Sequence, residues 1–152
     1  MQIEYTLAQS EKQKLRDDLR TPNPRVSNRT TLLYQYTKGV VRLSCGGESL
    51  ELYIPVLDFA WSLLHIISRL QTDDQAIFEF TESEDRISFH RSAVINITSD
   101  YLDWSCQCTY EQLQASVVTF AQTVLDDLCT SIPEIAKHSL IEEAYAKLEG
   151  IK

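Results

Sequence analysis

The hydrophobic residues are densest between Pro55 and Leu70, where nearly every side chain is large and apolar. A helix that is apolar around most of its circumference has to be covered on most sides. Proline suits the first position of a helix, because its missing N–H would be unpaired there anyway. The pattern therefore predicts a central core helix over residues 55–70. Its few polar side chains recur at helical spacing and form one narrow stripe: Asp58, Ser62, His65 and Arg69.

Apolar and polar residues alternate in the segments before this helix, which is the pattern of half-buried strands. Residues 2–7 alternate in this way, and residues 31–54 are interpreted as three strands. Turns are expected at Lys38-Gly39 and at Gly46-Gly47. Connections this short favour antiparallel pairing, since parallel neighbours need a long crossover.

A short helix is expected between the first strand and the next. Residues 10–13, with the sequence Ser-Glu-Lys-Gln, match a capping box, in which the first side chain bonds a backbone N–H of the first turn. The pattern predicts a helix over residues 11–20. The two prolines in residues 21–24 should break this helix, and residues 25–29 are expected to form an exposed loop.

Alternation resumes after the core helix and predicts a second group of strands. Turns are expected at residues 82–85 and 98–100. Residues 93–97 either continue the strand before them after a bend near Ser92, or form the next strand. The alternating segments are residues 76–81, 87–89, 93–97 and 102–108.

Two helices are predicted in the last third of the chain. Residues 109–112 and 131–134 both match capping boxes, and each is followed by a one-sided apolar stripe. A helix with one apolar face lies on a sheet or on another helix. Strands and helices do not alternate regularly, so the predicted class is α+β. We expect an antiparallel sheet built from strand meanders, packed on the central helix 55–70 and the two C-terminal helices.

The length of 152 residues favours one domain, 1–152, with a single core. The longest apolar stretch contains charged residues and is shorter than the ~20 residues that a membrane span requires. The chain does not begin with a signal-peptide pattern, so a cytoplasmic location without membrane contact is expected. The four cysteines should then be reduced thiols. They are Cys45, Cys106, Cys108 and Cys129.

We expect no metal, no cofactor and no enzymatic activity. Only one residue separates Cys106 from Cys108, whereas zinc sites favour two or more, so both are interpreted as core residues of a strand. The four glycines form no phosphate-binding loop. Asp58, Ser62 and His65 share the polar stripe, but a hydrolase nucleophile normally lies on a strained turn and not in the middle of a helix. The stripe is therefore interpreted as the solvated edge of the core helix.

Charge is distributed unevenly along the chain. Residues 1–42 contain eight Lys and Arg against four Asp and Glu, and residues 43–152 contain six against eighteen. The first part therefore carries +4 and the second −12, which gives −8 for the whole chain. Such a charge repels the phosphates of DNA and RNA, and it attracts basic proteins. Nucleic-acid binding is accordingly not expected.

The densest acidic region lies around residues 79–85 and 100–103. It reads either as a solvated surface that protects a sheet edge, or as a docking face for a basic partner. Two aromatic residues nearby could anchor such a partner, because aromatic side chains dominate the energetics of interfaces. The predicted partner-binding residues are Glu79, Glu82, Glu84, Asp85, Asp100, Tyr101, Asp103 and Trp104.

The order of elements over residues 31–130 resembles the small acidic immunity proteins of bacterial polymorphic and contact-dependent growth-inhibition toxins. The matching parts are a strand meander, the core helix, the hairpin FEFTESEDRISF, the strand AVINIT and the capped helix that follows. The resemblance rests on organisation and charge, and it transfers no site residue. It implies a non-enzymatic inhibitor that binds one cognate toxin domain, often a nuclease, and occludes its active site or an adjacent surface.

Two other classes of function remain open. The protein could be an adaptor or assembly subunit whose partner is not a toxin. It could also bind a small ligand in a pocket between the core helix and the sheet. The side chains proposed to line that pocket are Tyr34, Tyr36, Tyr53 and His90.

Overall fold

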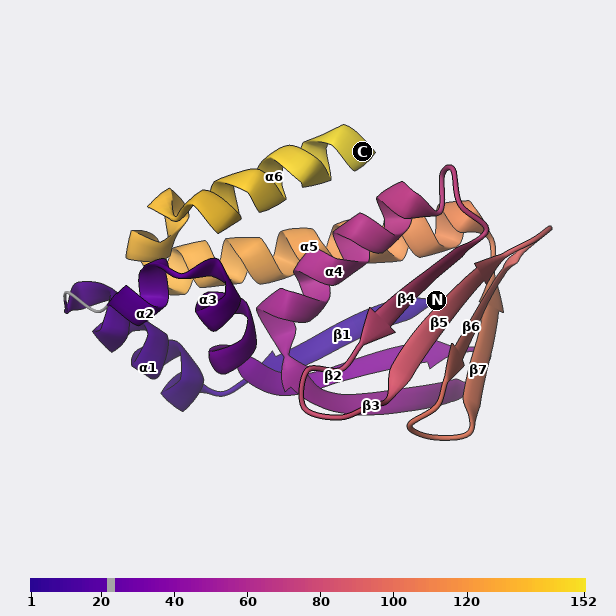
Figure 1. Cartoon of the computed structure of the whole chain (residues 1–152), viewed down its shortest axis with the longest axis horizontal. Helices are drawn as coiled ribbons and strands as arrows, with labels where there is room; N and C mark the ends of the chain where they lie inside the picture. The colour runs from indigo at the N-terminus through magenta and orange to yellow at the C-terminus, as the bar shows by residue number, and fades with distance from the viewer. Residues whose placement is uncertain (22–23) are drawn as a thin grey trace.

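The computed structural model describes residues 1–21 and 24–152 and shows an α+β fold with two antiparallel sheets (Figure 1). The predicted class is confirmed, and the strands divide into a three-stranded and a four-stranded sheet. The predicted break at residues 21–24 includes residues 22–23, which lie outside the described part. The elements are β1 (Gln2–Leu7), α1 (Gln9–Arg20), α2 (Pro24–Ser27), α3 (Arg29–Gln35), β2 (Lys38–Cys45), β3 (Glu48–Pro55), α4 (Val56–Arg69), β4 (Gln75–Glu79), β5 (Arg86–Arg91), β6 (Ile95–Ser99), β7 (Trp104–Cys108), α5 (Tyr110–Ser131), the 3-10 helix η1 (Pro133–Lys137) and α6 (Ser139–Ile151).

The three-stranded sheet has the order β1-β2-β3, with all pairs antiparallel. The hairpin between β2 and β3 turns at Gly46 and Gly47, as predicted. Both glycines have positive φ, 62° and 85°, which the tightest right-twisted hairpin turn requires and glycine adopts without steric cost. Figure 1 shows α1, α2 and α3 together beyond one end of this sheet.

The prediction of a strand over residues 31–36 is wrong, because this segment belongs to helix α3. The Asn28 side chain accepts a hydrogen bond from the N–H of Thr31 and caps the helix. Leu32 and Leu33 are both buried, which helical spacing allows and strand alternation does not. The predicted loop at residues 25–29 is also wrong, since α2 ends at Ser27 and α3 begins at Arg29.

The predicted turn at Lys38-Gly39 is likewise wrong, because both residues begin β2. Gly39 is required there for close packing and not for a turn: a Cβ atom at this position would clash with the carbonyl oxygen of Thr6 in the neighbouring strand β1. The expected hairpin between residues 31–36 and β2 is therefore absent. Strand β2 pairs with β1 on one side and with β3 on the other.

Helix α4 forms the centre of the core, as predicted, although Pro55 is its N-cap and the helix begins at Val56. Pro55 supplies no side-chain cap. Thr37 supplies it instead: its carbonyl accepts from the N–H of Val56 at 2.9 Å, and its hydroxyl accepts from the N–H of Leu57 at 3.2 Å. Thr37 is fully buried and has a φ of 59°, so the cap fixes an otherwise unfavourable backbone conformation.

Aromatic contacts join α4 to its neighbours on two sides. The ring of Phe59 meets Phe78 of β4 edge to face at 4.8 Å and Phe120 of α5 at 6.0 Å. Figure 1 shows α4 between α5 and the four-stranded sheet, with α6 along the outer side of the helical layer. The core helix therefore connects the four-stranded sheet to the C-terminal helices.

The four-stranded sheet is a meander with the order β4-β5-β6-β7. Residues 95–99 form their own strand β6, which resolves the alternative left open by the sequence. Cys106 and Cys108 of β7 are buried in the core, as predicted, and Trp104 is buried on the same face. Leu102, at the start of the predicted segment 102–108, lies in the preceding turn and is 52% exposed.

A disulfide bond joins the two sheets. Cys45, at the end of β2, is bonded to Cys106 of β7, with a sulfur–sulfur distance of 2.04 Å. The prediction of four reduced thiols is therefore wrong for this pair, while Cys108 and Cys129 are free thiols. The sequence could not reveal the pairing, because the two cysteines are 61 residues apart and connectivity is not readable from spacing.

Of the three predicted capping boxes, one is present. Thr109 and Gln112 cap α5 reciprocally, as predicted. Ser10 lies inside α1, whose N-cap Ala8 makes no side-chain bond. Ser131 is the last residue of α5, and α6 is capped by the His138 ring, which accepts from the N–H of Leu140.

Within residues 1–21 and 24–152, no helix has the length and hydropathy that crossing a bilayer requires.

Candidate partner-binding surface

The meander brings the two predicted acidic segments to the same end of the four-stranded sheet. The connection from β4 to β5 and the connection from β6 to β7 both leave the sheet there. The backbone N–H of Asp100 donates to the carbonyl of Arg86 at 3.1 Å and fixes one segment to the other. We call this surface the acidic end, and it consists of Glu79, Glu82, Glu84, Asp85, Asp100, Tyr101 and Asp103.

Exposure supports seven of the eight predicted partner-binding residues. Asp85 is half-buried, and the other six of the acidic end are exposed. Trp104 differs: it is only 6% exposed, on the inner face of β7, and so cannot serve as a surface anchor. Its indole N–H is buried without a hydrogen-bond partner among the described residues. The prediction that Trp104 contacts a partner is therefore corrected.

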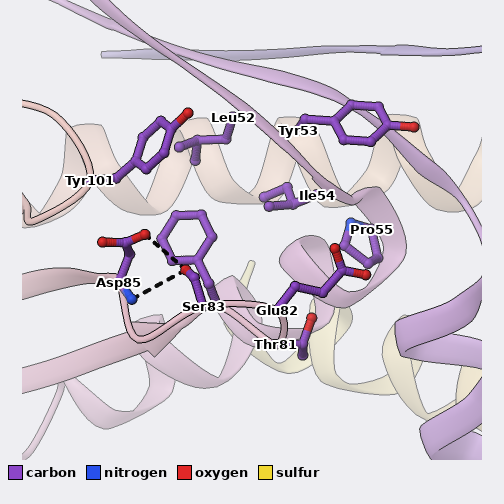
Figure 2. Close-up of a pocket in the computed structure, with 10 residues that line it drawn as sticks. Leu52, Tyr53, Ile54, Pro55, Thr81, Glu82, Ser83, Asp85 and Tyr101 are labelled. Carbon is purple, nitrogen blue, oxygen red and sulfur yellow. Dashed lines mark hydrogen bonds between the residues drawn. The ribbon is translucent and has the colours of Figure 1, made fainter.

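A hollow of about 210 Å³ lies beside the acidic end, between β3 and the β4–β5 connection (Figure 2). Figure 2 shows Tyr101 and Tyr53 on one side of it, with Asp85 and Glu82 on the opposite side. Tyr53 is 71% exposed and Tyr101 51%, so both rings are available to a partner. The lining residues are Leu52, Tyr53, Ile54, Pro55, Phe80, Thr81, Glu82, Ser83, Asp85 and Tyr101.

Hydrogen bonds hold the β4–β5 connection in one conformation. The N–H of Phe80 donates to the carbonyl of Asp85 at 3.2 Å, and the Ser83 hydroxyl donates to the Asp85 carboxylate at 2.8 Å. The Ser83 oxygen also accepts from the N–H of Asp85 at 3.2 Å. The last two of these bonds are the dashed lines between Ser83 and Asp85 in Figure 2. The surface is thus ordered before any partner binds, which reduces the entropy lost on association.

Among the described residues, one carboxylate of the acidic end is paired with a cation. Glu82 accepts from the Lys38 ammonium at 2.6 Å, and this hydrogen bond raises the pKa of Lys38. Among the described residues, Glu79, Glu84, Asp100 and Asp103 form no ion pair. Their charges remain available to a basic surface.

Sequence reasoning missed Tyr53 and Leu102 as parts of this surface. Tyr53 belongs to the outward side of β3, together with Glu51, so an aromatic residue at a polar position was the available signal. Leu102 is 52% exposed beside Tyr101. Tyr53 and Leu102 therefore add two large apolar side chains to the surface that already contains Tyr101.

The polar stripe of α4 lines a second hollow, of about 290 Å³, next to β4. Burial raises the pKa of Asp58 to about 6, against a smaller lowering by the Ser62 hydroxyl. The pKa of His65 is lowered, first by burial and then by the charges of Lys147 and Arg29. In the described structure, no hydrogen bond links His65 to Asp58 or Ser62, so the geometry of a catalytic triad is not formed. Asp58 is also buried, which corrects the interpretation of the whole stripe as a solvated edge.

The four residues predicted to line a ligand pocket between the core helix and the sheet lie in different places. Tyr34 lines the hollow beside α4, and Tyr53 lines the hollow beside the acidic end. Tyr36 is buried, with its hydroxyl donating to the Asp18 carboxylate. His90 is exposed on β5. The prediction that these residues line a common pocket is wrong.

Across residues 1–21 and 24–152, no three side chains from His, Cys, Asp and Glu are grouped closely enough to hold a metal ion. The Cys106 sulfur is held in the disulfide and Cys108 is buried, where burial raises the pKa of its thiol. A thiolate pair is therefore not formed at Cys106-x-Cys108.

Comparison with protein-family models, curated proteins and solved structures found no match for the chain. The functional argument therefore depends on the residues of the acidic end and their geometry.

Proposed function

We propose that the protein is a non-enzymatic inhibitor of the immunity-protein type, which binds a basic toxin domain through the acidic end. One observation carries the proposal. Strand β3 and two connections that are distant in sequence place the exposed rings of Tyr53 and Tyr101 around one hollow with the carboxylates of Glu82 and Asp85. The same two connections carry Glu84 and Asp100, which form no ion pair among the described residues. Contiguous exposed apolar side chains rimmed by charge are typical of protein-binding surfaces.

The charge and the apolar side chains have separate roles in this proposal. The unpaired carboxylates attract a basic domain, raise the rate of encounter and select against acidic partners. Tyr53 and Tyr101 supply the contact area that holds the complex once formed, because aromatic side chains lose little conformational freedom when they bind. A basic active-site cleft, such as that of a nuclease, matches both properties.

The size of the hollow favours a protein side chain as its occupant. Pockets for small ligands usually have volumes of about 300–1,000 Å³. The hollow beside the acidic end has a volume of about 210 Å³. A lysine or arginine side chain of the toxin would place its apolar stem against Leu52 and its charge beside Glu82 and Asp85.

The cellular compartment remains a prediction. The cytoplasm was expected from the absence of a signal-peptide pattern, but the Cys45–Cys106 disulfide is of the kind that persists in oxidising compartments. Trapping free thiols with a maleimide reagent in intact cells distinguishes a reducing from an oxidising compartment. Four modified cysteines after denaturation would indicate a reducing compartment, and two would indicate an oxidising one.

The experiment that tests the function is growth rescue. The protein is co-expressed with the toxin domain encoded beside it, and growth and co-purification are scored. We expect rescue by the wild-type chain and loss of rescue by Glu84→Lys combined with Asp100→Lys. Glu48→Lys combined with Glu142→Lys is the matched control, because both residues are exposed, lie elsewhere and change the net charge equally.

Each outcome has a distinct meaning. Equal rescue by both double variants would show that the inhibitor acts through another surface. Binding without rescue would favour the adaptor alternative, which needs a partner but no neutralisation. Failure of the wild-type chain both to bind and to rescue would contradict the proposal.

A further inference from the structure

Strand β4 has an open edge. It is the outermost strand of the four-stranded sheet and pairs only with β5. The N–H of Arg91 donates to the carbonyl of Asp74, and the N–H of Phe80 donates to the carbonyl of Asp85. Even-numbered residues of this strand therefore face β5, since the direction of the backbone groups alternates. Gln75, Ile77 and Glu79 direct their N–H and C=O groups outward, where no described backbone group meets them.

This edge lacks three of the devices that usually prevent strand pairing. Lysine, proline and bulges are the common protections of an edge strand, and residues 75–79 contain none of them. The central residue is Ile77, which is apolar, β-branched and 38% exposed. A hollow of about 520 Å³ runs beside it, lined by Arg69, Gln75, Ala76, Ile77 and Glu79. The edge is thus accessible to another strand.

The outward residues of β4 can pair favourably with the same residues of a second copy when the two strands run antiparallel. With Ile77 opposite Ile77 of the second copy, Gln75 lies opposite Glu79 at both ends. The three outward residues then pair with one another, and each pair can exchange two backbone hydrogen bonds. A shift that centres the pairing on Glu79 would place like charges face to face, which is unfavourable.

Charge favours the same register. Arg69 lines the hollow at the end of β4 where Gln75 lies, and its side chain is exposed. Antiparallel pairing brings Glu79 of the second copy to this end. Arg69 pairs with Asp73 of its own chain at 3.3 Å. Glu79 forms no ion pair among the described residues, so this register brings two unpaired carboxylates, one at each end, near the Arg69–Asp73 pairs.

We propose that the protein forms a two-fold symmetric dimer in which the β4 strands of two copies pair antiparallel about Ile77. The two four-stranded sheets then become one eight-stranded sheet. The opposite edge, β7, packs against β3 and carries the disulfide to Cys45, so it does not offer a second open edge. Pairing through one edge closes after two copies and does not continue into a filament.

The test measures mass in solution over a range of protein concentrations, by sedimentation velocity or light scattering. We expect a dimer for the wild-type chain. Ile77→Lys should raise the dimer dissociation constant by at least about a hundredfold, because two ammonium groups would meet at the two-fold axis. Val40→Lys is the matched control: Val40 is also β-branched and 38% exposed, but it lies on the central strand β2. Circular dichroism verifies that each variant is folded.

A cross-linking variant tests the register. In a hydrogen-bonded antiparallel pair the Cα atoms are about 5.5 Å apart, which a disulfide can span. Ile77→Cys should therefore give a disulfide-linked dimer under mild oxidation, and Val40→Cys should not. A monomeric wild-type chain at about 100 μM, well above the dissociation constants of most specific homodimers, would overturn the proposal. A dimer that survives Ile77→Lys, or one that Ile77→Cys does not cross-link, would do the same. The proposal does not depend on the proposed function.

Discussion

At the scale of single residues, burial decides what the polar side chains of α4 do. Asp58 lies in the first turn of the helix, where the positive end of the helix dipole favours a carboxylate. Burial outweighs this effect and raises the pKa of Asp58 to about 6. His65, about two turns further along the same stripe, is exposed and packs edge to face on Trp61 at 4.5 Å. Asp58 and His65 thus belong to the same polar stripe but differ in burial.

The raised pKa of Asp58 predicts a pH-dependent stability. The folded protein binds the proton more tightly than the unfolded chain, so stability contributed by this residue falls as the pH rises from about 4 to about 6. The difference between the ordinary value of 3.8 and about 6 corresponds to about 3 kcal/mol at pH 7. We expect Asp58→Asn to gain up to about this much in unfolding free energy at pH 7 relative to its value at pH 4.

Urea unfolding of the wild type and of Asp58→Asn across this pH range tests the prediction. The comparison uses the change with pH, because any cost of burying the amide is independent of pH. Glu142→Gln, at an exposed position, should show a difference from wild type that hardly varies. A flat difference for Asp58→Asn as well would show that the carboxylate is not destabilised by burial.

At the scale of elements, the sequence predicts segments best where one periodicity dominates. The alternation in residues 2–7 and the apolar helix after Pro55 were both assigned correctly. Residues 31–36 were not, because Leu32, Tyr34 and Tyr36 alternate like a strand while Leu32, Leu33 and Tyr36 also fit a helical face. The adjacent buried pair and the Asn28 cap decide for the helix.

Tertiary partners also determined features that local patterns cannot show. Asp127 is one example, because nothing in its local sequence indicates a partner. It accepts hydrogen bonds from the Lys12 ammonium at 2.7 Å and from the Tyr5 hydroxyl at 2.8 Å, and so connects α5 to α1 and β1. Burial alone would raise the pKa of Asp127, but these donors more than offset it and lower the pKa. The pairing of Cys45 with Cys106 is a second feature of this kind.

The disulfide leads to a prediction about how the two sheets are held together. It closes a loop across a separation of 61 residues and restricts the unfolded chain. Replacing both cysteines, Cys45→Ser with Cys106→Ser, should reduce the unfolding free energy by about 2–4 kcal/mol. Denaturant unfolding with and without dithiothreitol measures the effect. The reductant should destabilise the wild type and leave the double variant unchanged, and equal responses would show that the bond contributes little.

At the scale of the whole molecule, the strand order brings the residues of the acidic end together. The acidic residues can be read from the sequence, but only the meander explains why residues 79–85 and 100–103 meet. Trp104 was assigned wrongly, because its neighbours in sequence are exposed and its own side chain points to the core. Tyr53 was missed since it comes from the other sheet. Sequence proximity is a poor guide to a surface that three separate segments build.

The two proposals combine into one arrangement. Antiparallel pairing of β4 reverses the direction of the second sheet, so the acidic ends of the two copies would point away from each other. Such a dimer would present two binding surfaces and could engage two toxin domains at once. Because Glu79 lies within β4, its contribution to a toxin surface would be shared with the dimer contact. Glu84 and Asp100 lie beyond the strand ends and remain free for a partner.

The last prediction concerns the rate at which a basic partner binds. Charges at the rim of an interface act mainly on association, whereas buried aromatic anchors act mainly on dissociation. Glu84→Lys with Asp100→Lys should therefore lower the association rate constant at low salt by at least about tenfold and flatten its salt dependence. Glu82 is avoided, because its pair with Lys38 would be lost as well. Tyr101→Ala should instead raise the dissociation rate constant.

Surface plasmon resonance against the cognate toxin domain, at several salt concentrations, separates the two effects. Glu48→Lys with Glu142→Lys carries the same total charge and should retain most of the wild-type association rate, because steering depends on where the charges lie. If both double variants slow association equally, net charge alone attracts the partner and the acidic end has no special role. If neither changes the rate, the partner binds elsewhere. A selective loss in the first double variant, with an unchanged melting temperature, is the result expected of a docking surface.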